Sequence, residues 1–425
     1  MRIGFSRNKS VLSVGFLGAA AAALILTPTP SRAWSIPPTR DLNVKTDCGA
    51  AGNGRADDTR HIQSCIGTAA SSGQGVYFPP GTYKVTAALT ITSGNMLLYG
   101  TNSGRTRIVQ ATARANLFTI ANGGKPVNQV TLRQLELLYA KRNPTGLTVY
   151  CDNCWRGRFT HVIFGDPGTP HLFSTGLWVN GGNQIFVEDS EFDFTASQGM
   201  YFRGTGDVYL SNLEVNDSAS DTTTTGLVFD SGVGGIYATN VNVTSGETGY
   251  LFENTQVGGI VPQFGFFTNC LADTLNGVGW DFEAAGSMRL TNSWAATGFY
   301  GVIAKAVTGL SITDSRIYNN SQAGIWLDTR ATDVSVKDST ITRNSRTSPG
   351  ADPGILVAAG VGRFQILGNE IGAADGFGST QSYGVLINGG SSDNFMIVGN
   401  DLQNNMTGEY RNGGSGSHAL IKDNL

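Results

Sequence analysis

Charged residues, cysteines and long apolar segments are all scarce in this chain. Only 14% of its 425 residues are charged, and a net charge of −3 with a pI near 5.8 argues against a general nucleic-acid binder. Five cysteines are too few to hold a chain of this length as a disulfide scaffold. Glycine, by contrast, occurs 57 times, and this balance suits many short strands joined by turns.

The first 33 residues predict an export signal. Basic residues precede an apolar run from Val11 to Leu26, and Ser31-Arg32-Ala33 supplies small residues where a signal peptidase prefers them. The run is short for a membrane span, and no later segment is long and apolar enough to be one. We therefore expect a secreted or periplasmic protein that is cleaved after Ala33 and has no stable membrane insertion.

The cysteine spacing allows two local disulfides. In an oxidising compartment Cys48 and Cys65 could pair across the N-terminal segment, and Cys151 and Cys154 could close a tight loop. Cys270 is then left over. It falls at an inward position of the repeat described below, where a small buried thiol is expected.

A glycine-led phrase recurs along most of the chain. In Gly279-Trp280-Asp281-Phe282-Glu283 the alternation of a β-strand sends Trp280 and Phe282 to one face and the two carboxylates to the other. The phrase returns at steps of 22 to 30 residues, which indicates a solenoid with loops of variable length. Its glycines are Gly146, Gly176, Gly199, Gly226, Gly249, Gly279, Gly301, Gly324, Gly354 and Gly384.

A second phrase accompanies the glycine strands and has Asn or Asp at its third position. These residue types tolerate a left-handed backbone and bond within their own turn, so stacked coils predict a ladder of side chains at a tight turn. We therefore interpret the aspartates in this register, and His161 with them, as structural and not catalytic. The positions are Asp189, Asn212, Asn240, Asn292, Asp314 and Asp338.

Residues 41–85 carry the most distinctive motif. Asp47-Cys48-Gly49-Ala50 is followed by Gly52-Asn53-Gly54-Arg55-Ala56-Asp57-Asp58-Thr59 and later by Phe78-Pro79-Pro80-Gly81-Thr82-Tyr83. This segment closely resembles the opening of the pectate-lyase-like superfamily of right-handed parallel β-helices, which includes polysaccharide lyases, glycoside hydrolases related to polygalacturonase, and phage tailspikes. The motif is specific for the fold and not for one reaction.

The resemblance implies an all-β fold, a single-stranded right-handed parallel β-helix of about ten to twelve coils. Residues 34–425 would form this one domain, with 34–75 as an N-terminal cap and 411–425 as a C-terminal tail that caps the helix or lies loose. A short α-helix is expected from Arg60 to Ala70. It would close the first coil, as the terminal caps of repeat proteins must.

Two aspartates stand directly before that expected α-helix. Asp57 and Asp58 form a tempting catalytic pair, but carboxylates at this position satisfy the free N–H groups of a helix start, and we interpret them as a cap. His61 lies on the helix itself and is interpreted as a surface or capping residue.

In the resembled superfamily the active-site sheet follows the longest and most variable loops. Here the variable segments 195–198, 218–225 and 255–278 precede glycine strands, so the resemblance implies that these strands form the active-site sheet. Their outward positions form two columns. The first contains Thr148, Trp178, Tyr201, Val228, Leu251, Asp281, Ile303, Trp326, Leu356 and Leu386. The second contains Tyr150, Asn180, Arg203, Asp230, Glu253, Glu283, Lys305, Asp328, Ala358 and Asn388.

The middle of the second column is a stack of like charges. Neighbouring parallel strands lie about 4.8 Å apart, so adjacent carboxylates among Asp230, Glu253 and Glu283 would repel by roughly 3 kcal/mol at an effective dielectric of 20. Such a stack requires a proton, a cation or a function, although a solvated acidic face is the alternative. The charged neighbours on this face are Asp281, Arg203 and Lys305.

Aromatic side chains share the same face. Trp178, Tyr201 and Trp326 point outward on this sheet, where sugar rings commonly stack, and we predict that these three and Asp328 bind substrate.

One reaction that fits is β-elimination from a uronic-acid polymer, in which the substrate carboxylate is neutralised and a base removes the C5 proton. Hard oxygen ligands suit Ca²⁺, and acidic residues paired at i and i+2 resemble the calcium-dependent pectate lyases. The predicted calcium ligands are Asp230, Glu253, Asp281 and Glu283. The predicted catalytic residues are Arg203, Lys305, Asp230 and Glu253, with a basic residue as base or carboxylate clamp.

Glycoside hydrolysis by two carboxylates is the alternative reaction, and a non-catalytic glycan-binding or surface protein is the third interpretation. Carboxylates on adjacent coils, about 5 Å apart, approach the retaining geometry, whereas Asp230 and Glu283, about 9.6 Å apart, fall in the inverting range. The polygalacturonase branch carries Asn-Thr-Asp, Asp-Asp and His-Gly phrases before these strands. They are missing here, so its catalytic set is not carried over.

A second acidic set is the reserve candidate. Glu191, Asp193 and Glu214 project from the neighbouring sheet just past the Asn turn. His171 lies in a loop before Gly176 and could reach the groove, but a loop histidine is more often simply exposed.

Overall fold

The computed structural model describes residues 40–425 except 167, 218–221 and 373–377. The predicted export signal and its cleavage position lie outside the described residues. Within them, no helix is long and apolar enough to cross a membrane.

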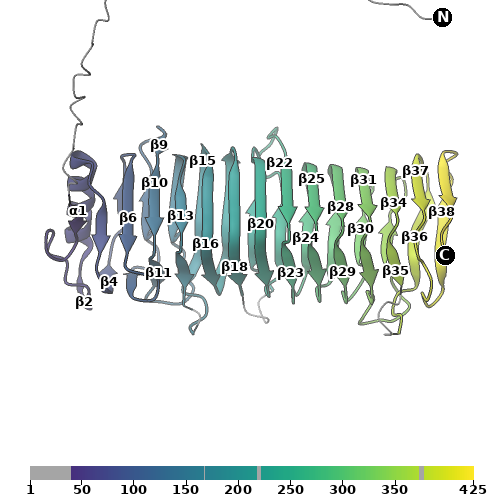
Figure 1. Cartoon of the computed structure of the whole chain (residues 1–425), viewed down its shortest axis with the longest axis horizontal. Coiled ribbons are helices and arrows are strands. Elements are labelled where there is room, and N and C mark those ends of the chain that lie inside the picture. The colour runs from purple at the N-terminus through teal and green to yellow at the C-terminus, as the bar shows by residue number, and fades with distance from the viewer. Residues whose placement is uncertain (1–39, 167, 218–221, 373–377) are drawn as a thin grey trace, which may run out of the picture. The chain divides into compact units, whose positions relative to one another are not determined.

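The described residues form a right-handed parallel β-helix of about 13 turns and contain one α-helix, which confirms the predicted fold class. In Figure 1 the coils follow one another from α1 at the purple end to β38 at the yellow end. A typical coil passes through one strand of a 14-stranded sheet and then two strands of a 25-stranded sheet. The expected ten to twelve coils is an underestimate, because the first coils, through β5 and β8, lack the glycine phrase.

The 14-stranded sheet contains the glycine strands. Its members are β5 (Leu89–Ile91), β8 (Phe118–Ile120), β9 (Val127–Asn128), β12 (Val149–Trp155), β15 (Phe173–Asn183), β17 (Thr195–Thr205), β19 (Thr225–Phe229), β21 (Thr248–Phe252), β24 (Val278–Phe282), β27 (Tyr300–Ala304), β30 (Ile325–Leu327), β33 (Ile355–Val357), β36 (Tyr383–Gly390) and β38 (Gly408–Gly414).

The 25-stranded sheet has two rows, one before and one after the Asn turn. The first row contains β1 (Leu42–Asn43), β3 (Val76–Phe78), β6 (Met96–Gly100), β10 (Val130–Arg133), β13 (Arg158–Thr160), β16 (Ile185–Asp193), β18 (Val208–Asn216), β20 (Gly234–Thr244), β22 (Gln263–Thr268), β25 (Ala285–Thr291), β28 (Val307–Thr313), β31 (Thr332–Lys337), β34 (Gly362–Leu367), β37 (Phe395–Val398) and β39 (Ala419–Lys422). The second row shares β16, β18 and β20 and adds β2 (Asn53–Asp57), β4 (Gly81–Val85), β7 (Thr106–Gln110), β11 (Glu136–Tyr139), β14 (Ile163–Gly165), β23 (Leu271–Asp273), β26 (Trp294–Ala296), β29 (Arg316–Tyr318), β32 (Thr340–Thr342) and β35 (Glu370–Gly372).

The helix α1 (Thr59–Ser72) covers the first coils, as predicted. Its buried face is Ile62, Cys65, Ile66 and Ala69, and it ends at Gly73, which has the left-handed φ of 73° that glycine adopts without strain. The predicted disulfide between Cys48 and Cys65 joins α1 to the preceding loop.

The predicted helix cap is right for one aspartate and wrong for the other. Asp57 accepts a hydrogen bond from the Thr59 N–H. Asp58 is buried, and its carboxylate instead accepts from the backbone N–H groups of Ala51 and Gly52, at 2.6 and 3.0 Å. Asp58 therefore holds the glycine-rich loop against the coil. His61 is exposed at the surface, as expected.

The tight turns form the predicted ladder. The Asn, Asp and His161 positions have φ between 47° and 54°, in the left-handed region. Asn212 donates to Asp189 at 3.0 Å, and Asn240 donates to Asn212 at 3.0 Å. Asn269 continues the ladder, since it donates to Asn240 and has a φ of 55°. The sequence pattern does not predict Asn269, because a cysteine follows it in Thr268-Asn269-Cys270, whereas a serine or an aliphatic residue follows the other Asn and Asp positions.

Inside the coils, like residues stack on like. Tyr250 and Trp280 lie face to face at 3.8 Å, and Phe252 and Phe282 at 4.5 Å. Cys270 is buried and free, as predicted. The second predicted disulfide, Cys151–Cys154, is also present.

Three regions that the sequence predicts to be variable or loose are instead regular. Segment 195–198 belongs to β17, and segment 255–278 contains β22 and β23 and so completes a coil. Residues 411–425, expected to cap the helix or lie loose, contain the end of β38 and all of β39, which pair in parallel with β36 and β37. The C-terminal tail therefore continues the β-helix, because its polar side chains can face solvent while its backbone extends the sheets.

A second, buried amide ladder supports the later coils. The Asn344 amide donates to Gln381 Oε1 at 2.9 Å, and Asn344 Oδ1 accepts from the Asn320 amide at 2.9 Å. All three side chains are fully buried. Each side-chain amide thus supplies a hydrogen-bond partner to the next one in the ladder.

We predict that Asn344→Ala lowers the free energy of unfolding by about 2–4 kcal/mol, because it leaves buried groups of Asn320 and Gln381 without partners. Asn242→Ala is the matched control. Asn242 is half-buried on the outer face and donates one hydrogen bond to Glu214, so its loss should cost less than about 1 kcal/mol. Urea unfolding measures both, and equal effects would contradict the buried-ladder account.

Candidate functional site

The outer face of the glycine strands carries the predicted site, and the strand register confirms most of its columns. Trp178 pairs with Tyr201, Tyr201 with Val228, Leu251 with Asp281, and this alignment continues to Leu386. Asp230, Glu253 and Glu283 each directly follow paired residues at the ends of β19, β21 and β24. The structure therefore brings the acidic stack together as predicted.

In the first coil of the two columns, the predicted positions are two residues away from the observed register. Tyr150 pairs with Trp178 and belongs to the first column, while Asp152 pairs with Asn180 and belongs to the second. Thr148 is buried and does not face outward. The reason is that Gly146 precedes β12, whereas Gly176 lies inside β15.

Asp230 is a fully satisfied carboxylate. It is buried and accepts hydrogen bonds from the N–H and hydroxyl groups of Ser231 and Thr255, and from the Tyr201 hydroxyl at 2.6 Å. Burial alone would favour the neutral form, but these hydrogen bonds outweigh it and lower the pKa of Asp230 to about 2. Asp230 is a stable anion whose oxygens are already occupied.

Glu253 is the opposite case. It lies between Asp230 and Glu283 and is half-buried, and its carboxylate has no hydrogen bond or ion pair to any residue that the structure describes. Burial raises the pKa of Glu253, and the negative charges of Asp230 and Glu283 raise it further. This carboxylate has free lone pairs and an increased affinity for a proton.

Lys305 closes the stack on its other side. Its ammonium contacts Glu283 Oε1 and lies 3.6 Å from Asp281 Oδ2. Burial would lower the pKa of Lys305, but these carboxylates raise it overall, so the side chain stays protonated at neutral pH. Asp281 is only 8% exposed, and its Oδ1 has no partner among the described residues. Burial raises the pKa of Asp281 to about 6, although Lys305 opposes the shift.

Arg203 lies on the other side of Asp230. Its Nε donates a long hydrogen bond of 3.4 Å to Asn180, which in turn donates to Asp152 at 3.0 Å. Arg203 is half-buried, so its guanidinium remains available to a ligand. Asp152 also belongs to the second column, although the sequence prediction omits it because of the two-residue shift.

The aromatic residues divide into supporting and accessible ones. Tyr201 stacks on Trp178 at 4.1 Å, is nearly buried, and donates to Asp230, so it supports the site from below. Burial and then Asp230 raise the pKa of Tyr201. Trp178 and Trp326 are half-buried at the two ends of the acidic stack, and Asp328 follows Trp326 on the same face.

The predicted calcium ligands do not form a metal cage. Among residues 40–425, without the gaps named above, no group of three or more His, Cys, Asp or Glu side chains is placed to hold a metal ion. The Asp230 oxygens are taken by hydrogen bonds, and Glu283 is held by Lys305. In this arrangement the four carboxylates offer few free oxygens to a cation.

The reserve set lies on the second row of the other sheet. Glu191 aligns with Glu214, and Asp193 with Asn216, whose amide donates to Asp193 at 3.2 Å. Burial, and then the charge of Glu191, raises the pKa of Asp193. His171 is half-buried, with Nδ1 at 3.0 Å from Asn143 Oδ1. The structure places neither group with the acidic stack.

Two family models match the chain. Residues 42–251 match the model described as rhamnogalacturonase A/epimerase, pectate lyase-like, and residues 175–425 match the model of the right-handed β-helix region. The chain therefore belongs to the right-handed β-helix family, and its residues 42–251 are similar to the pectate lyase-like model.

Similarity to individual proteins is local in sequence and broad in fold. The mannuronan C5-epimerase AlgE3 of Azotobacter vinelandii is 45% identical over 76 residues, which are 16% of this chain and 4% of that protein. Its relative AlgE6 is 44% identical over 75 residues, or 16% of this chain and 8% of that protein. The matched segment thus spans less than a tenth of either relative.

Two solved phage structures share the fold. The pre-mature gene product 12 of bacteriophage phi29 has a TM-score of 0.63 and 14% identity, covering 90% of this chain and 55% of that chain. Tailspike protein 3 of bacteriophage CBA120 has a TM-score of 0.57 and 12% identity, covering 90% and 60%. At these identities the similarity concerns the fold alone.

The raised pKa of Asp281 predicts a pH-dependent cost to stability. A carboxyl group whose pKa rises from 3.8 to about 6 on folding binds more protons in the folded state, so stability falls as the pH rises through this window. Asp281→Asn should therefore raise the free energy of unfolding at pH 7 by up to about 3 kcal/mol and change it little below pH 4. Denaturant unfolding at both pH values tests this. A variant that is destabilised at pH 7 would contradict it.

Proposed function

We propose that this protein cleaves an acidic, uronic-acid-containing polysaccharide by β-elimination on the outer face of the glycine strands. The observation that carries the proposal is Glu253, a half-buried carboxylate with a raised pKa and no partner among the described residues. A carboxylate in this state is a stronger proton acceptor than an ordinary glutamate. Its neighbours are already engaged, so Glu253 is the group of the stack that is ready to react.

In the proposed step Glu253 takes the C5 proton of a uronate residue. The C–H electron pair forms a C4–C5 double bond, the C4–O4 bond breaks, and the departing oxygen takes a proton from Asp281 or from water. Asp281 suits this role because its pKa is about 6. Protonated Glu253 then returns its proton to solvent, and Asp281, where it was the donor, takes one up from solvent, which completes the cycle.

Cationic groups neutralise the substrate. The Lys305 ammonium and the Arg203 guanidinium lie on opposite sides of the acidic stack, too far apart to share one carboxylate. Either can bind the carboxylate of a uronate residue that lies beside it, which makes the C5 proton of that residue more acidic. Because its pKa is raised, Lys305 acts as a clamp and not as the base. Asp230, with a pKa of about 2, fixes Tyr201 and the Ser231–Thr255 backbone in place.

The relatives support a polysaccharide as substrate. Residues 42–251 match a pectate lyase-like model, and two relatives are by name C5-epimerases of mannuronan. Loss of the C5 proton is the step that elimination shares with epimerisation at the same carbon. We further propose that residues 1–33 direct export, so that the enzyme meets its polymer outside the cytoplasm.

Hydrolysis by two carboxylates is the second candidate. It is favoured by one observation, the contrast between the raised pKa values of Asp281 and Glu253 and the low pKa of Asp230. Such a contrast divides the acid and base roles in glycosidases. A glycan-binding protein without catalysis is the third candidate.

The test is the ultraviolet absorbance of unsaturated uronides during incubation of the mature chain with a panel of acidic polysaccharides. Glu253→Gln should lower kcat by about 10²- to 10⁴-fold, because it removes the proton acceptor and keeps the shape. Its melting temperature should not fall, since Glu253 makes no stabilising contact among the described residues. Glu370→Gln, an exposed residue of β35, is the matched control and should retain full activity.

The same assay separates the alternatives. Reducing ends without absorbance would indicate hydrolysis, and silence in both assays across the panel would contradict catalysis at this face. Wild-type activity of Glu253→Gln would move attention to Glu191 and Glu214. A parallel incubation with a chelator tests the calcium prediction, and the donor set described above leads us to expect no loss of activity.

A further inference from the structure

A second face of the β-helix carries a ladder of outward-facing aromatic rings. Phe186, Tyr209, Tyr237 and Phe266 occupy one outward position on the successive first-row strands β16, β18, β20 and β22. Their rings stack nearly parallel, with centroids 4.7, 5.0 and 5.6 Å apart. Because each ring faces the next, only the two end faces of this aromatic ladder can receive another group.

The two ends of the ladder differ. At one end the guanidinium of Arg158 covers Phe186, 4.0 Å from the ring centroid. At the other end Phe266 is 39% exposed and aligns with Arg289 on β25, and no further ring of the described chain stacks on it. Phe264, 53% exposed, lies beside it. The open end therefore presents aromatic surface next to a cation.

Beyond Arg289 the same outward position becomes small. Ser311 on β28 and Ser335 on β31 follow it, before Gln365 on β34 and Met396 on β37 restore larger side chains. A drop in side-chain volume between larger neighbours leaves a depression in the sheet surface.

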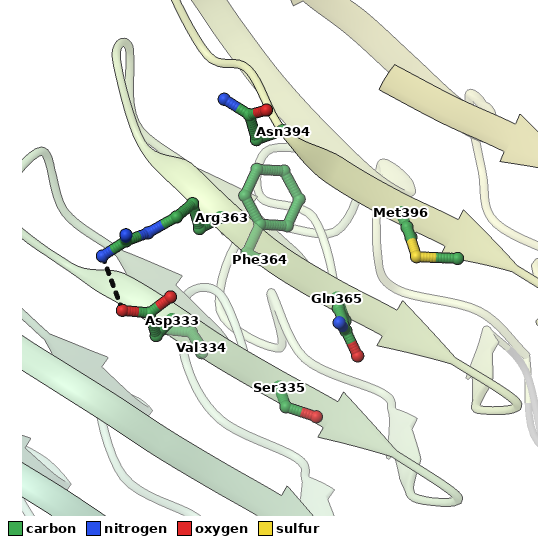
Figure 2. Close-up of a pocket in the computed structure, with 8 residues that line it drawn as sticks. All are labelled: Asp333, Val334, Ser335, Arg363, Phe364, Gln365, Asn394 and Met396. Carbon is green, nitrogen blue, oxygen red and sulfur yellow. Dashed lines mark hydrogen bonds and ion pairs between the residues drawn. The ribbon is translucent and has the colours of Figure 1, made fainter. Parts of the chain in front are cut away.

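That depression consists of two hollows, of about 440 and 250 Å³, which meet at Asp333 and Ser335. Figure 2 shows the second hollow, where Ser335, Gln365 and Met396 project from three successive strands and Arg363 is paired with Asp333 at 2.7 Å. We call the two hollows together the serine trough. Its first part is lined by Phe264, Phe266, Ser287, Met288, Arg289, Gly309, Leu310 and Ser311.

Two polar groups of the serine trough lack partners among the described residues. The Ser335 hydroxyl is buried and makes no hydrogen bond. Arg289 is exposed and makes no ion pair. Of these two groups only the guanidinium is accessible, and a ligand carboxylate would pair with it.

We propose that the serine trough binds an acidic oligosaccharide that lies along the helix axis, across the strands. A sugar ring would stack on Phe266, its carboxylate would pair with Arg289, and hydroxyls of the following rings would meet Gln365. Three strand steps separate Arg289 from Gln365, about 14 Å, which suits a segment of two or three sugar rings. The unpaired guanidinium favours an acidic glycan over a neutral one. This binding does not depend on Glu253, so it stands or falls separately from the proposed function.

The test is the affinity of the full mature chain for acidic oligosaccharides, namely oligogalacturonates and oligomannuronates, with neutral oligosaccharides of equal length as reference. Isothermal titration would be done on the Glu253→Gln variant, so that no ligand is consumed. Addition of either Arg289→Gln or Phe266→Ala to this variant should weaken the affinity for acidic oligosaccharides about tenfold, and added salt should weaken it further. Arg114→Gln, an exposed arginine near the N-terminal coils, is the matched control and should change nothing.

Three results would overturn the proposal. They are no binding of any acidic oligosaccharide, unchanged affinity in both trough variants at unchanged melting temperature, and binding that Trp178→Ala removes while the trough variants keep it. Sedimentation measurements test the other possible occupant of this face, a second copy of the chain. A concentration-dependent dimer that Phe266→Ala dissociates, without glycan binding, would assign the serine trough to a second copy of this chain.

Discussion

The parallel register of the strands is the constraint on which the rest of this structure depends. Each coil sets its residues about 4.8 Å above the equivalent residues of the previous coil, so every position becomes a column of neighbours. In the core the columns pair Tyr250 with Trp280, and at the turns they join Asn212 to Asn240. The same register compels Asp230, Glu253 and Glu283 to stack on the outside, where like charges are unfavourable.

The structure relieves this repulsion unevenly. Asp230 is stabilised as an anion by five hydrogen bonds, and Glu283 by Lys305. Glu253, between them, receives neither kind of partner from the described residues, and both neighbours raise its pKa. An arrangement that spends stability on one unpaired carboxylate is typical of functional sites, where catalytic needs and stability conflict.

The fold and the column through Trp178 to Leu386 could be predicted from sequence, because the glycine phrase fixes both register and facing. The prediction failed where the phrase shifts, as at Tyr150 and Asp152, since alternation alone cannot reveal a two-residue displacement. The burial of Tyr201 beneath Trp178 and the satisfied state of Asp230 depend on side-chain packing across coils, which no single-strand pattern encodes.

Two other features illustrate the limits of the pattern. Asp58 looks like a helix cap in sequence, yet it bonds to a loop six and seven residues earlier in the chain, at Gly52 and Ala51. The sequence prediction lacks the aromatic ladder for a different reason, because its columns contain only the outward positions of the glycine strands. Counting from the Asn turns on the first-row strands would have aligned Phe186, Tyr209 and Tyr237, since each stands three residues before its turn.

The most direct measurement of the central claim is the titration of the Glu253 side chain in the folded protein. Carbon-13 labelling of glutamate carboxyls, with the signal assigned by its absence in Glu253→Gln, would yield its pKa. The account predicts a value above the ordinary 4.5, because burial and the charges of Asp230 and Glu283 disfavour ionisation. A value at or below 4.5 would mean that Glu253 is solvated or paired, and it would contradict the role assigned to this carboxylate.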